Sequence, residues 1–143
     1  MADFPERLVY VDDELDMRTI VRETLESNGF DGAFAACGSA KELLNRWAVL
    51  QPEMILLDLK MPDMSGLDLI EAIFQDPEKN NIPIVFVTGA IKVEMLEKYK
   101  KLGVIGVIHK PFDLGKLTDL ITDLWAKRKE NLEPEPEAEE GSD

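Results

Sequence analysis

Apolar residues along the chain form five short runs, each followed by a segment in which apolar residues recur every three to four positions. The runs are typical of buried strands, and they cover residues 7–11, 30–36, 54–57, 83–87 and 104–109. The segments after them have helical spacing, and we expect helices that begin near residues 17, 39, 67, 93 and 113 and end near residues 28, 50, 75, 102 and 129. Strands that alternate with helices five times predict an α/β fold.

Polar and small residues mark several of the expected helix ends. Ser39, with Glu42 three residues on, forms the pattern of a capping box, and Asp113 is a favoured N-terminal cap. Gly29 and Gly103 stand where two helices are expected to stop.

The alternation also predicts how the elements pack. Parallel strands joined by crossover helices form a sheet with helices on both faces, and near-continuous apolar runs such as MILL at 54–57 fit burial on both sides. A doubly wound sheet of this size most often has the strand order 2-1-3-4-5. The expected fold is therefore a flavodoxin-like (βα)5 three-layer sandwich with a five-stranded parallel sheet.

Composition and charge narrow the class of protein. The chain has 143 residues of which 45% are apolar, which suits one compact domain that we place at residues 1–129. Residues 130–143 contain seven acids and no Lys or Arg, so we expect a disordered acidic, Pro/Glu-rich tail or linker there. The formal charge of -13 argues against nucleic acid as a direct partner.

Three features bear on location. No apolar run approaches the ~20 residues that a membrane helix needs. The N-terminal residues lack the basic and apolar regions of a signal peptide, and Cys37 has no second cysteine to pair with. We therefore expect a cytoplasmic protein without a membrane partner.

Polar side chains stand at the ends of four expected strands. Asp12 and Asp13 follow the first strand, Asp58 the third, Thr88 the fourth and Lys110 the fifth. In the strand order 2-1-3-4-5 these strands are neighbours, and ligands of such sheets bind beyond the carboxyl ends of the strands. Each residue alone has an ordinary explanation, such as a helix start or a solvated turn, but together they predict one site.

The chemistry of this cluster follows from its charges. Three crowded carboxylates repel one another, and a divalent cation relieves the repulsion. An oxygen-only site with few ligands suits Mg²⁺. A carboxylate nucleophile, a metal, a lysine and a hydroxyl are the groups that phosphoryl transfer needs.

Four segments carry these side chains, and in order along the chain they are Asp12-Asp13, MILLDLKMPDMSG (54–66), Thr88-Gly89-Ala90 and Lys110-Pro111-Phe112. In this order and spacing, over about residues 7–128, the chain resembles the response-regulator receiver family of two-component signalling. The resemblance implies a bacterial phosphorelay domain that takes a phosphoryl group onto Asp58, as an aspartyl phosphate, from a sensor histidine kinase or a histidine phosphotransfer protein. Such a domain is not an enzyme beyond its own phosphorylation and dephosphorylation.

The resemblance also assigns roles to single residues. It implies that Mg²⁺ is held by Asp12, Asp13, Asp58 and the backbone carbonyl of Lys60, with Asp12 acting partly through water. Lys110 would contact the phosphoryl group, and Thr88 would move towards it.

Further roles concern the backbone around the site. The resemblance implies a cis peptide bond between Lys110 and Pro111. Pro62 and Gly66 match the family's loop after the acceptor.

One position of the sequence departs from the family, and two others are positions that tune the phosphate lifetime in the family. Similar receivers often carry Tyr or Phe three residues before the lysine, where this chain has Val107. A branched aliphatic side chain cannot change rotamer as that ring does, so the signal travels by another packing change or this face switches less. Lys60 and Ala90 occupy the positions that tune the phosphate lifetime in the family, and Lys60 points into solvent or forms a loose ion pair.

The last helix has an apolar stripe wider than one buried face needs. With Tyr99 of the preceding helix, it forms either a wide core stripe or a surface for a homodimer or a downstream protein. The single histidine, His109, is expected to be packed or half-exposed within a strand.

Rival functions fail on specific residues. A haloacid-dehalogenase-type phosphatase needs a second acid two residues after its nucleophile, where this chain has Lys60. A nucleotide-binding enzyme needs a glycine-rich phosphate loop after the first strand, and none is present. A receiver that acts only as a scaffold usually lacks some of the acids or the lysine, and this chain keeps them all. The sequence leaves open whether the protein is a stand-alone regulator, a phosphorelay intermediate or part of a longer protein.

Overall fold

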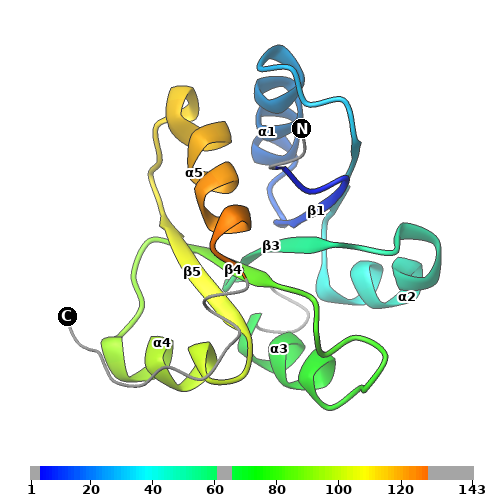
Figure 1. Ribbon diagram of the computed structural model, residues 1–143, viewed down its shortest axis with the longest axis vertical. Coiled ribbons are helices and arrows are strands. Elements are labelled where there is room, and N and C mark those ends of the chain that lie inside the picture. Colours follow the sequence, from blue (N-terminus) through cyan, green and yellow to red (C-terminus); the bar gives the residue numbers. More distant parts are fainter. Residues whose placement is uncertain (1–3, 61–65, 129–143) are drawn as a thin grey trace.

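A computed structural model of the protein describes residues 4–60 and 66–128 (Figure 1). Strands and helices alternate along the chain in the order β1 (Arg7–Val11), α1 (Leu15–Ser27), β2 (Ala33–Cys37), α2 (Ala40–Leu50), β3 (Met54–Asp58), α3 (Gly66–Phe74), β4 (Ile84–Thr88), α4 (Val93–Lys100), β5 (Val104–His109) and α5 (Leu114–Ala126). The strands form one parallel sheet in the order β2-β1-β3-β4-β5. The predicted fold class and strand order are confirmed.

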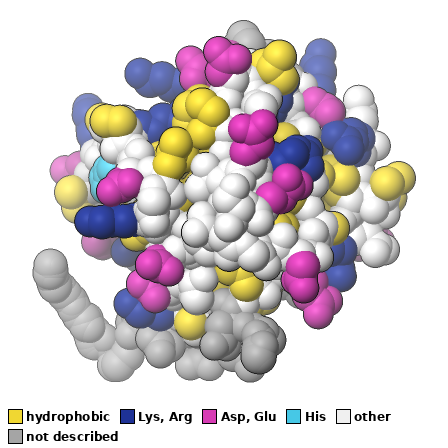
Figure 2. All heavy atoms as spheres, turned by 90° about the horizontal axis from the view of Figure 1, so that it is seen from above, with side chains coloured by type: hydrophobic (Ala, Val, Ile, Leu, Met, Phe, Trp, Pro, Cys, Tyr) yellow, Lys and Arg dark blue, Asp and Glu magenta, His cyan; other side chains and the backbone are white. Residues whose placement is uncertain are grey.

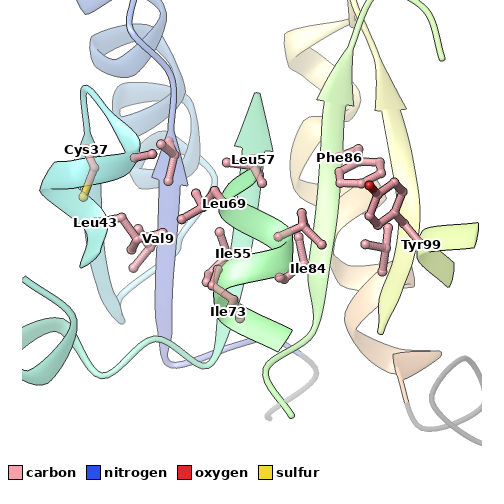
Figure 3. Close-up of a cluster of buried hydrophobic side chains, with 14 residues drawn as sticks. Val9, Cys37, Leu43, Ile55, Leu57, Leu69, Ile73, Ile84, Phe86 and Tyr99 are labelled. Atoms are coloured by element: carbon pink, nitrogen blue, oxygen red, sulfur yellow. The ribbon is translucent and has the colours of Figure 1, made fainter. Parts of the chain in front are cut away.

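The sheet has a separate apolar core on each face, because successive side chains of a strand point to opposite sides. One face packs against α1 and α5, which lie side by side in Figure 1, and we call its buried residues the α1/α5 core. The other face packs against α2, α3 and α4, and its buried residues form the α2–α4 core. Figure 3 shows strand residues of the α2–α4 core, such as Val9 and Ile84, beside Leu69 and Ile73 of α3. The central strands β3 and β4 are buried along their whole length, as their uninterrupted apolar sequences predict.

The helix ends follow the predicted local chemistry. The Ser39 hydroxyl accepts a hydrogen bond from the Glu42 backbone N–H at 3.0 Å, and Asp113 accepts one from the backbone N–H of Gly115 at 2.9 Å. Gly29 and Gly103 follow α1 and α4 with φ of 92° and 132°, a region that favours glycine. These four residues therefore begin or end their helices as expected.

Three details differ from the sequence expectations. The second strand begins at Ala33 rather than at residue 30, because Phe30 instead packs its ring on Phe4, with centroids 5.0 Å apart. His109 is the last residue of β5 and is exposed, not packed. Tyr99 is 3% exposed and belongs to the α2–α4 core, so it contributes little to a partner surface.

The surface and the chain ends complete the description. On the face shown in Figure 2, acidic side chains are interspersed with Lys and Arg. Among the described helices, none has the length and apolar character needed to cross a bilayer. Two expectations, the acidic tail at residues 130–143 and the role of Pro62, lie outside the described residues.

Candidate functional site

Three carboxylates gather at the carboxyl edge of the sheet. Asp58 is the last residue of β3, and Asp12 and Asp13 directly follow β1, which is the neighbour of β3. One oxygen from each side chain lies within 4.8 Å of the others. The predicted convergence of these acids is therefore present in the structure.

Asp12 is fully buried, and its carboxylate accepts three hydrogen bonds. Its Oδ1 accepts a hydrogen bond from the Glu14 backbone N–H at 2.9 Å, and its Oδ2 accepts from the Tyr10 hydroxyl at 2.5 Å and from Lys110 Nζ at 3.2 Å. Its backbone is fixed too, since its carbonyl accepts from the Arg18 guanidinium at 2.7 Å. A buried carboxylate needs such donors, because without them the loss of hydration is costly.

Asp58 is 6% exposed and has fewer partners. Its Oδ1 accepts from the Lys60 backbone N–H at 3.0 Å, and its Oδ2 accepts from Lys110 Nζ at 3.3 Å. Burial raises the pKa of the Asp58 carboxyl, with the Lys60 N–H and the Lys110 ammonium acting against this and the Asp12 charge adding to it. The negative charge of the cluster is thus only partly compensated by the protein.

Lys110 bridges the two buried acids. Its ammonium lies between the Oδ2 atoms of Asp12 and Asp58, and its side chain is 25% exposed. Burial acts to lower the pKa of Lys110, but the two carboxylates outweigh it and the pKa is raised. The backbone N–H of Lys110 donates to the Thr88 carbonyl at 2.8 Å, and the bond to Pro111 is cis, as predicted.

The donor set fits a hard cation. Asp13 is exposed, Asp12 is buried and Asp58 nearly so, and all three offer only oxygen ligands. Oxygen ligands with an open side are what Mg²⁺ prefers, since it retains waters or phosphate oxygens in its shell. The chemistry of these residues is consistent with the predicted metal.

Thr88 is the last residue of β4 and is 2% exposed, and its hydroxyl makes hydrogen bonds with the backbone of Ala90. It donates to the Ala90 carbonyl at 3.1 Å and accepts from the Ala90 N–H at 3.4 Å. Ala90 itself is exposed. The hydroxyl is therefore engaged within its own loop.

The other predicted residues lie around this edge. The Lys60 side chain is exposed, which agrees with its expected orientation into solvent, and Pro111 is exposed beside the site. Val107 is half-buried against the α2–α4 core. These positions are compatible with the expected roles but do not test them.

The sequence pattern assigned Tyr10 only to a buried strand, and its contact with the site was missed. Its ring is buried in the α1/α5 core, while its hydroxyl reaches Asp12. Burial raises the pKa of the Tyr10 phenol far above its usual value, and the Asp12 carboxylate adds to this, so Tyr10 acts as a donor. A signal was available, because a buried tyrosine needs a hydroxyl partner and residues two apart in a strand share a face.

Comparison with known proteins agrees with this geometry. Residues 8–122 match the family described as the response regulator receiver domain. Sporulation initiation phosphotransferase F of Bacillus subtilis is 27% identical over 117 residues, which cover 81% of this chain and 90% of that protein. A protein-glutamate methylesterase/protein-glutamine glutaminase of Clostridium acetobutylicum is 32% identical over 120 residues, covering 79% of this chain but only 34% of that protein.

Solved structures show the same fold. A CheY-like response regulator receiver domain protein from Methanospirillum hungatei superposes with a TM-score of 0.74 at 23% identity, over 87% of this chain and 97% of that one. Because the family match covers most of the chain, the protein belongs to the response regulator receiver domain family, the CheY-like signalling domains of two-component systems.

Proposed function

We propose that the protein accepts a phosphoryl group on Asp58 from a phosphohistidine of a sensor kinase or a phosphotransfer protein. The observation that carries this is the position of Asp58, nearly buried at the end of β3, with Lys110 Nζ 3.3 Å away and two further carboxylates within 4.8 Å. A carboxylate nucleophile beside a cation and a metal-ligating cluster is the arrangement that phosphoryl transfer requires.

In the transfer step, an Asp58 carboxylate oxygen attacks phosphorus and forms a P–O bond. The P–N bond to the donor imidazole breaks, and its electron pair returns to the ring. Lys110 is placed to balance the charge of the transferred oxygens, because it already contacts the acceptor carboxylate. In hydrolysis, a water oxygen attacks phosphorus and the P–O bond to Asp58 breaks, so no other substrate is needed.

Asp12, Asp13, Asp58 and the backbone carbonyl of Lys60 would hold Mg²⁺. When bound, the ion neutralises charge on the carboxylates and on the phosphoryl oxygens. Asp12 enters this set with most of its lone pairs already engaged, which fits a role partly through water.

Phosphorylation would produce its signal through a conformational change of Thr88, the loop after β4 and α4. For its hydroxyl to reach the phosphoryl group, Thr88 must give up its hydrogen bonds to Ala90 and so move the loop after β4. Val107 cannot follow by swinging a ring, so we assign the response to the loop and α4. Lys60, two residues after the acceptor, and Ala90, two residues after Thr88, are the positions that we expect to set the phosphate lifetime.

Partners follow from the exposed apolar side chains of the last helices. Met95 of α4 and Leu120 of α5 are 40% and 38% exposed, and Leu102 after α4 is 45% exposed. We assign these side chains to contacts with a downstream protein or a second copy of the chain, and the role of phosphodonor to a cytoplasmic kinase. The formal charge of -13 supports a protein rather than a nucleic-acid partner.

The test is intact mass after incubation with acetyl phosphate, with and without Mg²⁺. Wild type should gain one phosphoryl group, about 80 Da, only when Mg²⁺ is present. Asp58→Asn should gain none, whereas Asp119→Asn, an exposed acid on α5, should be labelled like wild type. If neither acetyl phosphate nor a phosphorylated kinase labels wild type, the protein acts as a scaffold and the proposal is wrong.

A further inference from the structure

Tyr10 brings a hydroxyl from the apolar interior to the edge of the site. Its ring is 1% exposed in the α1/α5 core, on a strand whose other buried residues are aliphatic. The hydroxyl donates to Asp12 Oδ2 at 2.5 Å. A buried phenol without this polar partner would be unfavourable, so the contact fixes both side chains.

The oxygen that Tyr10 contacts is also the one that Lys110 contacts. Lys110 Nζ lies 3.2 Å from Asp12 Oδ2 and 3.3 Å from Asp58 Oδ2, so one ammonium serves two carboxylates. When Asp58 carries a phosphoryl group, three more oxygens compete for that ammonium. Asp12 is then the carboxylate that loses a donor, and it is fully buried.

We propose that Tyr10 is a positioning residue whose hydroxyl keeps Asp12 hydrogen-bonded while Lys110 turns to the phosphoryl group. This rests on the proposed function of Asp58 and Lys110. With Tyr10 present, Oδ2 goes from two donors to one. Without it, Oδ2 goes from one protein donor to none, and its remaining partner would be Mg²⁺ or a water that the ion holds, so the variant loses one hydrogen bond to a charged group in this state. Tyr10 therefore favours the phosphorylated state more than the free state.

The two tyrosines of the chain offer a matched pair of variants. Tyr10→Phe removes the hydroxyl at the site and keeps the ring. Tyr99→Phe removes the hydroxyl of the second tyrosine, which donates to Glu71 Oε2 at 3.3 Å on the opposite face of the sheet. Thermal unfolding of both variants establishes that each one folds.

The experiment measures two affinities by isothermal titration calorimetry: that for Mg²⁺ alone, and that for beryllofluoride, a phosphoryl mimic, at saturating Mg²⁺. In Tyr10→Phe, Lys110 still serves Asp12 in the Mg²⁺-bound state, so the Mg²⁺ dissociation constant should stay within about threefold of wild type. The beryllofluoride dissociation constant should rise about tenfold, the effect of losing one hydrogen bond to a charged group. Tyr99→Phe should change neither by more than about twofold.

Two results would overturn the role of Tyr10. One is a beryllofluoride affinity of Tyr10→Phe within about twofold of wild type, and the other is an equal loss of both affinities, which a merely structural role produces. Failure of the proposed function looks different: wild type itself would bind no beryllofluoride and gain no mass from acetyl phosphate. In that case both proposals fall.

Discussion

The carboxyl edge of the sheet has two halves that are built differently. In the acceptor half, made of Asp12, Asp58 and Lys110, side chains from three loops and strands hydrogen-bond to one another. In the switch half, made of Thr88 and Val107, the hydroxyl bonds to its own loop and the aliphatic side chain packs on the α2–α4 core. A backbone hydrogen bond from the Lys110 N–H to the Thr88 carbonyl, 2.8 Å long, links the two halves.

This difference separates the residues proposed to carry out phosphoryl transfer from those proposed to pass on the signal. The acceptor half is held in place before any phosphoryl group arrives, which favours fast transfer because little reorganisation is needed. In the proposed function the switch half has to break the hydrogen bonds of Thr88 in order to respond, so we expect it to set how strongly the protein signals. Disturbing one half should therefore leave the other nearly unchanged.

The largest effect is expected from Tyr99→Ala, behind the switch half. Tyr99 packs edge-on against Phe86 with ring centroids 6.1 Å apart, and its removal leaves a cavity in the α2–α4 core. We expect a loss of about 3 kcal/mol in the free energy of unfolding, measured by urea denaturation. The Mg²⁺ affinity of the variant should match wild type, and a marked change in it would show that the halves are not independent.

Lys110→Met should destabilise the acceptor half by about 2 kcal/mol, below the usual range for a broken buried pair because the lysine is a quarter exposed. The loss arises because Asp12 and Asp58 then face each other without a cation. Urea denaturation in EDTA measures it, and added Mg²⁺ should restore part of it. Lys116→Met, at an exposed position of α5, is the control and should change stability by less than about 0.5 kcal/mol.

Cys37 probes the flank of the acceptor half, since its carbonyl accepts from the Asp12 N–H at 3.0 Å. Burial raises the pKa of the Cys37 thiol to about 11 from 9.0, with Glu42 adding to the shift. The folded state therefore retains the proton longer than the unfolded state, and the stability this gives is present below pH 9 and lost as the pH rises towards 11. At pH 10, wild type should have lost about 1 kcal/mol more than Cys37→Ala, relative to each protein at pH 8. Equal pH dependence in the two proteins would contradict the shift.

The smallest effect is expected from Thr88→Val. The exchange keeps the shape of the side chain and removes only its hydrogen bonds to the exposed Ala90, which water can replace. Stability should fall by about 0.5 kcal/mol, and the Mg²⁺ affinity should not change. Beryllofluoride should still bind, but amide NMR shifts in α4 should respond less than in wild type, and an undiminished response would remove Thr88 from the output.

The sequence predicted the fold because its signals were local and mutually consistent. Alternating apolar strands and helices, with Gly29 and Gly103 at helix ends, predicted a doubly wound sheet, and 2-1-3-4-5 is the order that such a sheet most often has. The exception was the start of β2, where Phe30 is as apolar as a strand residue. Phe30 packs on Phe4, which precedes β1. These two residues are far apart in the chain, and no local sequence pattern contains such a contact.

The site was predictable in its residues but not in its connections. Strand ends located Asp12, Asp58 and Lys110 at one edge, because strand order alone brings them together. Which donor each oxygen receives depends on side-chain rotamers and on the depth of each group. The spacing of Tyr10 and Asp12 allows a contact to be predicted, but not that Tyr10 and Lys110 donate to the same oxygen of Asp12.

The two adjacent aspartates, Asp12 and Asp13, should also differ in which substitutions they tolerate. Replacing Asp12 by Glu would push the carboxylate about 1.5 Å past the donors from Tyr10, Glu14 and Lys110. Asp13 is exposed and has room to bend, so Glu or Asn there keeps an oxygen near the same place. In a randomised library selected for stable folding alone, position 12 should return Asp far more often than position 13 does, whereas selection for phosphorylation should also require an oxygen ligand for Mg²⁺ at position 13.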